Sequence, residues 1–158
     1  MGEAFGVATG ALQVADAGIK LAKTLYDYLD AVRNANKHLK AIALEVQVTS
    51  STLESLGSLL EDHDAEKLCS QNVLRDANAA FKGCGEAFAD VDETFKTVIK
   101  FDPDGKASVS SSGRWVWPFK KGKVEMLQAN LERLETTLLL MLSVLSFARE
   151  KARRCVGA

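Results

Sequence analysis

Side chains that could carry out chemistry are few in this sequence and poorly arranged for it. The two histidines, His38 and His63, fall in polar contexts near expected helix ends, which favours surface positions. The three cysteines lack the spacing of a metal site, and Cys84 lies on an apolar stripe, so inert thiols are expected. The sequence has no Gly-rich phosphate loop, no Glu-x-x-His pair and no nucleophile elbow. We therefore expect neither an enzyme nor a protein that binds a cofactor or metal.

Composition and charge narrow the class of protein further. The 158 residues suit a single domain, 1–158, and 47% of them are hydrophobic, which is enough for a substantial core. The formal net charge of −1 gives no electrostatic support for a nucleic-acid partner. The odd number of cysteines argues against a disulfide framework, and the N-terminus does not look like a secretory signal. A cytoplasmic location is the default expectation.

Four long segments show the apolar spacing of amphipathic helices. Helices are expected over residues 3 to 32, about 36 to 61, from a cap at Ser70 to 101, and over 122 to 154. In the last segment the spacing of three and four residues is unbroken. Its apolar stripe consists of Leu127, Leu131, Leu134, Leu138, Met141, Leu145 and Ala148. The pattern predicts an all-α fold, a four-helix bundle of long amphipathic helices.

The last helix is expected to be the central one. Nearly every residue from Leu138 to Leu145 is apolar, so this part should be covered on almost all sides. A second apolar face carries Val124, Leu140, Val144 and Phe147. A long loop is expected before this helix, because residues 102 to 121 contain an Asp-Pro-Asp-Gly turn signal and a serine-rich tract. Gly83 and Gly85, which flank Cys84 in the third helix, suggest a close helix crossing or a kink.

The first helix has a glycine every four residues at its start. Glycine costs a helix roughly 1 kcal/mol relative to alanine, whereas small residues at this spacing allow close helix contact in membranes. Its charged stripe begins only at Asp16. The opposite face is expected to be wide and apolar, with Phe5, Leu12, Ile19, Tyr26 and Leu29 and, alongside them, Val7, Val14, Leu21 and Leu25. Either the segment is a buried bundle member, or it leaves the bundle and inserts into a bilayer. The residues assigned to membrane or oligomer contact are Gly2, Phe5, Gly6, Val7, Gly10, Leu12 and Val14.

Aromatic and basic residues cluster just before the last helix. The cluster consists of Arg114, Trp115, Trp117, Phe119, Lys120 and Lys121. The aromatic rings either cover the open end of the bundle or anchor the chain at a membrane interface, where Trp and basic residues are favoured. The basic residues from Arg149 to Arg154 either attract anionic lipid or form a solvated helix end.

Several stretches resemble one family over essentially the whole chain. They are Met1-Gly-Glu-Ala-Phe-Gly-Val-Ala, Leu12-Gln-Val-Ala-Asp-Ala-Gly, Arg114-Trp-Val-Trp-Pro-Phe, Leu131-Glu-Arg-Leu and Leu138-Leu-Leu-Met-Leu-Ser-Val-Leu. The sequence resembles the N-terminal domain of fungal STAND (NLR-like) receptors, a group similar to the HeLo-like cell-death domains. The resemblance implies a helical-bundle effector placed before a nucleotide-binding oligomerisation module. In related domains, clustering releases an N-terminal hydrophobic segment that permeabilises membranes.

Two functions from different classes therefore remain open. The first is a cell-death or immune effector that self-associates and is recruited to membranes, with anionic lipid as a partner and the N-terminal helix as the membrane element. The alternative is a non-lytic interaction module that oligomerises or recruits a downstream partner through its helix faces. The two differ in whether the glycine-spaced helix must contact lipid. The sequence contains no Walker A motif, so a downstream STAND module would lie in a longer native chain.

Overall fold

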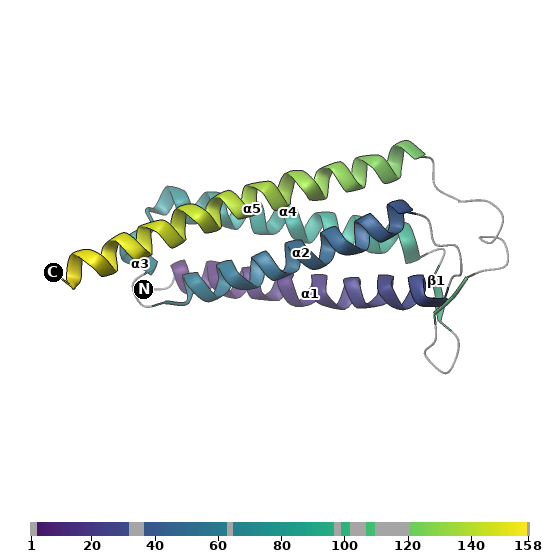
Figure 1. The fold of residues 1–158 in the computed structure, drawn as a ribbon, viewed down its shortest axis with the longest axis horizontal. Helices are drawn as coiled ribbons and strands as arrows, with labels where there is room; N and C mark the ends of the chain where they lie inside the picture. The colour runs from purple at the N-terminus through teal and green to yellow at the C-terminus, as the bar shows by residue number, and fades with distance from the viewer. Residues whose placement is uncertain are drawn as a thin grey trace.

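Four long helices run side by side along the molecule (Figure 1). The computed structural model describes residues 3–31, 37–62, 65–96, 99–101, 107–109 and 121–157. Within this part of the chain the long helices are α1 (Glu3–Ala31), α2 (Lys37–Leu60), α4 (Gln71–Lys96) and α5 (Lys121–Val156). A short helix, α3 (Ala65–Leu68), lies between α2 and α4. The predicted all-α four-helix bundle is confirmed.

Each long helix packs mainly against two of the others. The contacts place α1 against α2 and α4, and α5 against the same two helices, so α1 and α5 lie diagonally opposite. Successive long helices run in opposite directions along the bundle (Figure 1). The neighbouring helices α2 and α5 are therefore parallel to each other. This arrangement decides which helix faces are covered and which remain open.

The core lies where the predicted apolar stripes meet. The α5 stripe is buried at Leu127, Leu131, Leu134, Leu138 and Leu145, as expected. The apolar stripes of α2 and α4 pack against this α5 stripe in the core. Their largest fully buried side chains are Leu39, Ile42, Val46, Leu53, Leu56, Leu60, Phe81, Val91 and Phe95. Burial of each such side chain contributes roughly 1.5–3 kcal/mol relative to exposure.

The predicted helix boundaries hold except at the end of α4. The N–H of Val73 donates to Oγ of Ser70 over 3.3 Å, which confirms Ser70 as the cap. The helix was expected to reach Phe101 but ends at Lys96, and Ile99–Phe101 forms strand β1. This strand pairs antiparallel with β2 (Ala107–Val109), with Ile99 opposite Val109. The residues at 97 to 99, Thr-Val-Ile, are β-branched and favour a strand. The prediction of a helix up to Phe101 followed the helical spacing and missed this signal.

The buried face of α1 is built largely from small residues and differs in part from the predicted face. Phe5 and Ile19 were expected on the core side but are 62% and 48% exposed. The face that packs inward consists of Ala4, Ala8, Ala11, Ala15, Gly18 and Ala22, together with Leu21, Leu25 and Tyr28. Leu21 and Leu25 are thus buried as expected. Small side chains let α2 and α4 approach α1 closely, which large residues on this face would prevent.

Glycines at three crossings receive a side chain from a neighbouring helix. A Cβ at Gly57 of α2 would lie 2.7 Å from Cδ2 of Leu12, and one at Gly85 of α4 would lie 3.6 Å from Cγ2 of Val14. At Gly83 the nearest atom would be Cδ2 of Leu134 in α5, at 3.4 Å. Around Cys84, one glycine faces α1 and the other faces α5, but a Cβ at either would make only ordinary van der Waals contact. The close crossing or kink expected there stays a prediction.

Candidate interaction surface

The residues predicted for membrane or oligomer contact on α1 do not form one surface. Leu12 and Val14 are partly buried in the bundle, where they pack toward Gly57 and Gly85. Phe5 points to solvent, and a Cβ added at Gly6 would meet nothing within 4 Å. Val7 and Gly10 are partly buried, whereas Gly2 lies outside the described residues. The glycine spacing therefore does not mark a packed ridge in this state; the alanines and Gly18 form that ridge.

A hollow of about 590 Å³ lies between the start of α1 and the start of α4. Its lining is largely polar and consists of Glu3, Gly6, Val7, Gln71, Asn72, Leu74, Arg75 and Asn78. Gly10 borders the same region, because a Cβ there would lie 4.0 Å from Oδ1 of Asn78. The absence of side chains at Gly6 and Gly10 thus helps to keep this corner of the bundle open.

The predicted aromatic and basic cluster lies almost entirely outside the described residues. Arg114, Trp115, Trp117, Phe119 and Lys120 are not among them, and Lys121 is described only as the first residue of α5. Whether the rings cover the bundle or anchor it at a membrane stays a prediction.

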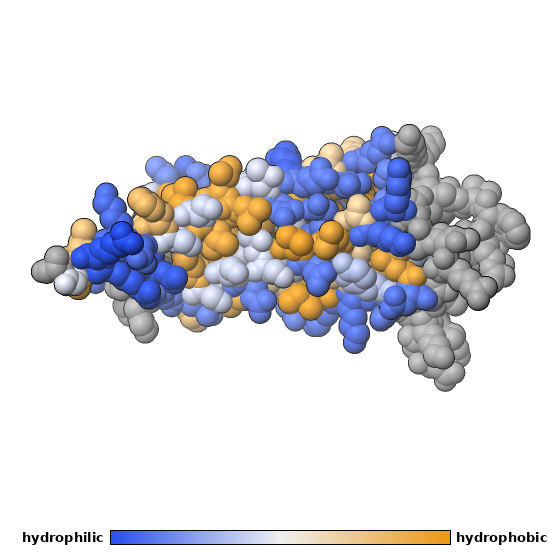
Figure 2. Space-filling view, in the orientation of Figure 1, coloured by the Kyte–Doolittle hydropathy of each residue, from blue (hydrophilic) through white to orange (hydrophobic). Residues whose placement is uncertain are grey.

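The structure instead exposes a large apolar face on α5, which the sequence analysis expected to be buried. Leu140, Val144 and Phe147 are 63%, 66% and 71% exposed, and Leu139 on the same side is 44% exposed. The expectation that α5 is covered nearly all round is therefore wrong. With α2 and α4 as its two main neighbours, α5 has only one face in the core. Figure 2 shows hydrophobic side chains reaching the surface over the middle of the molecule.

The exposed face has a regular spacing of its own. Alternate steps of three and four residues connect a second stripe, here called the outer seam, of Met126, Ala129, Arg133, Thr136, Leu140, Ser143 and Phe147. Every member is exposed. The hydroxyls of Thr136 and Ser143 donate to the carbonyls of Glu132 and Leu139 in the same helix, over 2.9 and 2.8 Å. These hydroxyls already have acceptors, so covering them costs less than covering unpaired polar groups. The seam has the spacing of a helix-pairing surface.

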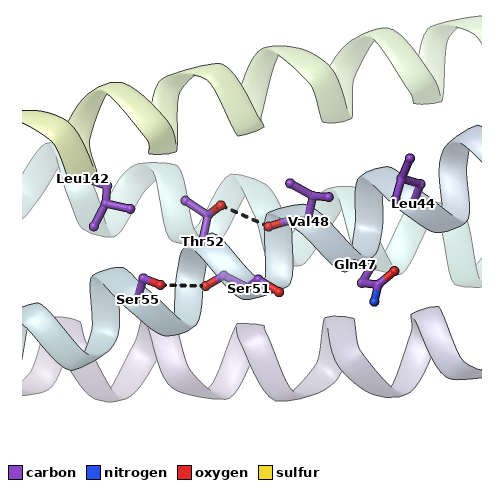
Figure 3. A pocket seen from close by; sticks show the side chains of 7 residues that line it. All are labelled: Leu44, Gln47, Val48, Ser51, Thr52, Ser55 and Leu142. Atoms are coloured by element: carbon purple, nitrogen blue, oxygen red, sulfur yellow. Dashed lines mark hydrogen bonds between the residues drawn. The ribbon is translucent and has the colours of Figure 1, made fainter.

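A groove of about 390 Å³ runs between α2 and α5 beside this face (Figure 3). Its lining consists of Leu44, Gln47, Val48, Ser51, Thr52, Ser55 and Leu142. The Thr52 hydroxyl donates to the carbonyl of Val48 over 3.0 Å, and that of Ser55 donates to the carbonyl of Ser51 over 3.1 Å. The groove therefore presents aliphatic groups and hydroxyls that are already hydrogen-bonded, and has no obvious catalytic group.

Near the start of α2, two carboxyl groups meet across the α2–α5 interface. Oε2 of Glu45 is buried and finds no N–H or O–H donor among the described residues. A hydrogen bond with Glu135, burial, and the negative charges of Glu135 and Glu132 raise the pKa of Glu45 to about 7. Glu45 therefore holds its proton up to a higher pH than an ordinary glutamate does.

The opposite end of α5 is attached to α2 by opposite charges. Carboxylate oxygen Oδ2 of Asp62, just after α2, lies 3.9 Å from a guanidinium nitrogen of Arg149 and 3.9 Å from one of Arg153. Arg154 pairs with Glu150 over 3.2 Å within the helix. Figure 2 shows the resulting hydrophilic cluster at the end of the molecule where the C-terminus lies. The basic residues expected to form a helix end are therefore partly engaged.

Metal-ligating side chains do not cluster in the described part of the chain. No group of three or more His, Cys, Asp or Glu side chains there could hold a metal ion. Burial raises the pKa of the Cys84 thiol to about 12 and also raises that of Cys69, so both remain protonated near neutral pH. Among the described helices, none combines the length and apolar character needed to cross a membrane.

Comparisons with known proteins add no relative. No family model, no curated protein and no solved structure matches the chain.

Proposed function

We propose that the chain is the effector or signalling domain of a fungal NLR-like protein of the HeLo-like group, and that it acts by association through the outer face of α5. One observation carries the proposal: Leu140, Val144 and Phe147 are exposed together on a helix whose opposite face packs in the core through Leu131, Leu138 and Leu145. Exposed apolar patches of this kind are typical of interaction sites. The sequence resemblance supplies the biological context.

Association through this face would depend on clustering. When several domains are held together by a neighbouring module, the second contact forms at a raised effective concentration. A modest apolar surface can then remain open in the isolated domain and become occupied after assembly. No chemistry by the domain itself is needed.

The test fuses the domain to a chemically inducible dimeriser in fungal host cells and measures growth after the inducer is added. The wild-type fusion is expected to arrest growth. Phe147→Glu should abolish the arrest, because a charge in place of the most exposed large side chain of the face cannot be covered without a desolvation cost. Ile19→Glu is the matched control, since Ile19 is also exposed but lies on the diagonally opposite helix. Arrest that persists in Phe147→Glu rejects the proposal.

A second candidate, membrane permeabilisation by α1, is favoured by a different observation. The fully buried side chains in the first half of α1 are only alanines, at positions 4, 8, 11 and 15. Alanine buries little apolar area, so this half is held by a smaller hydrophobic contribution than the leucine-rich stripes of α2 and α5. The hollow beside Gly6 and Gly10 further reduces its packing. Such a segment could leave the bundle at a low cost.

Dye leakage from anionic liposomes tests the second candidate. A forcibly oligomerised domain is expected to cause leakage, and deletion of residues 2 to 10 or the double change Gly6→Leu and Gly10→Leu should abolish it while the bundle stays folded. Liposomes that remain sealed with the oligomerised wild-type domain eliminate this candidate. The growth assay would then be explained by the α5 face alone.

A further inference from the structure

The outer seam of α5 carries its own complementary charges, which identify a partner for it. Toward the N-terminal side of the apolar centre lie Glu132 and Arg133, and toward the C-terminal side lie Glu150 and Arg153. Each half thus exposes an acid and a base at these positions, and the C-terminal half also exposes Lys151 and Arg154, which gives it a net positive charge. An antiparallel helix with the same sequence would therefore meet charges of opposite sign.

We propose that two copies of this chain associate through their outer seams, with the two α5 helices antiparallel about a two-fold axis near residues 141 and 142. This inference rests on the proposed function, because it names the partner of the same face. In two-stranded helical pairing, seam residues of one helix face seam residues of the other in layers. A two-fold axis makes each such contact occur twice.

The spacing selects one register. When Leu140 faces the partner's Ser143, Phe147 faces the partner's Thr136, and the apolar residues meet at the centre. In the same register Arg133 faces the partner's Glu150, within the seam. Glu132 flanks the seam opposite the partner's Arg153. The two-fold axis doubles these pairs to four, and all of them bring opposite charges together.

The environment of the seam is compatible with this pairing. The helix α5 packs on α2 and α4 with its other face, and it runs along one edge of the bundle (Figure 1). From Met126 to Arg154 the seam is about 42 Å long, at 1.5 Å per residue. Glu150, three residues beyond Phe147, continues the seam and now pairs with Arg154, and Arg153 lies 3.9 Å from Asp62. Such exposed pairs contribute little to stability and can be exchanged. The exposed Leu139 and Val144 lie on the two flanks of the apolar centre and would also be covered.

Charge reversal at one pair tests both the partner and the register. Sedimentation velocity of the complete chain at increasing concentration should show a monomer–dimer equilibrium for the wild type. Arg133→Glu should weaken dimerisation by about tenfold, because it replaces two attractions per dimer by two repulsions. Glu150→Arg should have the same effect. The double variant with both changes should restore the wild-type equilibrium, as should an equal mixture of the two single variants through a heterodimer.

Disulfide trapping provides an independent readout of direction. In the proposed register Asn130 lies near the partner's Lys151, whereas the two copies of either residue are about 30 Å apart along the helix. Two variants, Asn130→Cys and Lys151→Cys, are prepared in a Cys155→Ser background, since Cys155 is the exposed thiol among the described residues. Mild oxidation should link the mixture and leave each variant alone unlinked. Links formed within each separate variant would overturn the antiparallel arrangement.

The outcomes separate this inference from the function on which it rests. A wild-type chain that stays monomeric, including one that binds anionic vesicles or another protein through α5, overturns the self-pairing. A dimer that is insensitive to both charge reversals overturns the register. In either case loss of growth arrest in Phe147→Glu would still support the proposed function. Arrest that persists in Phe147→Glu would reject the function even if the chain dimerises as inferred. Circular dichroism confirms that each variant remains folded.

Discussion

Glu45 and Glu135 place two carboxyl groups where an interface between helices would ordinarily have an apolar or oppositely charged pair. The hydrogen bond to Glu135, burial, and nearby negative charge raise the pKa of Glu45 to about 7. An acid whose folded-state pKa is raised binds more protons in the folded state than in the unfolded chain. Its contribution to stability is therefore fully present below its ordinary pKa near 4.5 and is lost as pH rises toward about 7.

The first prediction is that stability falls between pH 5 and pH 8 and that Glu45→Gln largely removes this fall. The amide of glutamine can donate to Glu135 at every pH and carries no charge. The loss in the wild type should be of the order of 1 kcal/mol, once solvent screening of this partly exposed pair is considered. Urea unfolding at the two pH values measures it. An equal fall in Glu45→Gln would assign the pH dependence to other groups.

Two glycines on the same helix should respond to alanine with opposite signs. A Cβ at Gly18 would collide with Oγ of Ser50 and lie 2.6 Å from Cε2 of Phe88, whereas one at Gly6 would meet nothing within 4 Å. Gly18→Ala should therefore destabilise the bundle by about 1–3 kcal/mol, and Gly6→Ala should stabilise it by about 0.5–1 kcal/mol through helix propensity. Urea midpoints of both variants provide the comparison. Two changes of the same sign would show that α1 does not pack as described.

At the scale of the element, periodicity located the helices well but did not determine how many sides of each are covered. The leucines of the α5 stripe are buried as predicted and Met141 is partly buried, because three-and-four spacing places these residues on one face. The continuous apolar run from Leu138 to Leu145 predicted burial on nearly all sides of the helix. Sequence could not show that α1 lies diagonally opposite, since that depends on how the four helices pack.

Adjacent leucines in α5 give a direct test of this one-sided burial. Leu138 is fully buried and Leu140 is 63% exposed. Leu138→Asp should place an unpaired charge in the core and destabilise the fold by roughly 3–5 kcal/mol. Leu140→Asp should change the free energy of unfolding by less than about 0.5 kcal/mol. Thermal melts of the two variants at low protein concentration measure the difference, and comparable losses would mean that both faces are packed.

For α1, the predicted wide apolar face is correct only in part. Leu21 and Leu25 are buried, whereas Phe5 and Ile19 are exposed and the first half of the helix buries alanines instead. Alanine contributes little to a hydrophobic pattern but is decisive for how closely two backbones approach. The glycines were correctly singled out as unusual. Their partners, such as Leu12 beside Gly57, are long-range contacts that a single sequence does not reveal.

Local stability should therefore differ along the molecule. We expect the amides of residues 7 to 15 in α1 to exchange with deuterium faster than those of residues 46 to 56 in α2. Only alanines are fully buried in the first segment, whereas Val46, Leu53 and Leu56 are fully buried in the second. Hydrogen exchange read by mass spectrometry or NMR measures this. Equal protection of the two segments would remove the main support for release of the N-terminal helix.

At the scale of the whole molecule, the inward faces of the four long helices pack together, whereas the apolar outer face of α5 remains exposed to solvent. The sequence established the fold class and most helix bounds, because four amphipathic stripes can be satisfied in few ways. It assigned function to α1 and to the aromatic segment, whereas the clearest exposed apolar surface lies on α5. The candidate surface was missed because exposure is a property of the assembly of helices and not of any one of them.

Self-association through α5 has a consequence for the stability of the entire chain. A partner that binds only the folded state raises the unfolding temperature by mass action, so the melting temperature becomes dependent on concentration. We expect the wild-type Tm to rise over a hundredfold increase in protein concentration. Phe147→Glu should lie near the wild-type Tm at the lowest concentration, because Phe147 is 71% exposed, and should then remain constant. Differential scanning calorimetry on a dilution series measures both curves. A wild-type Tm that does not change with concentration would show that the outer face of α5 is not covered by a second copy.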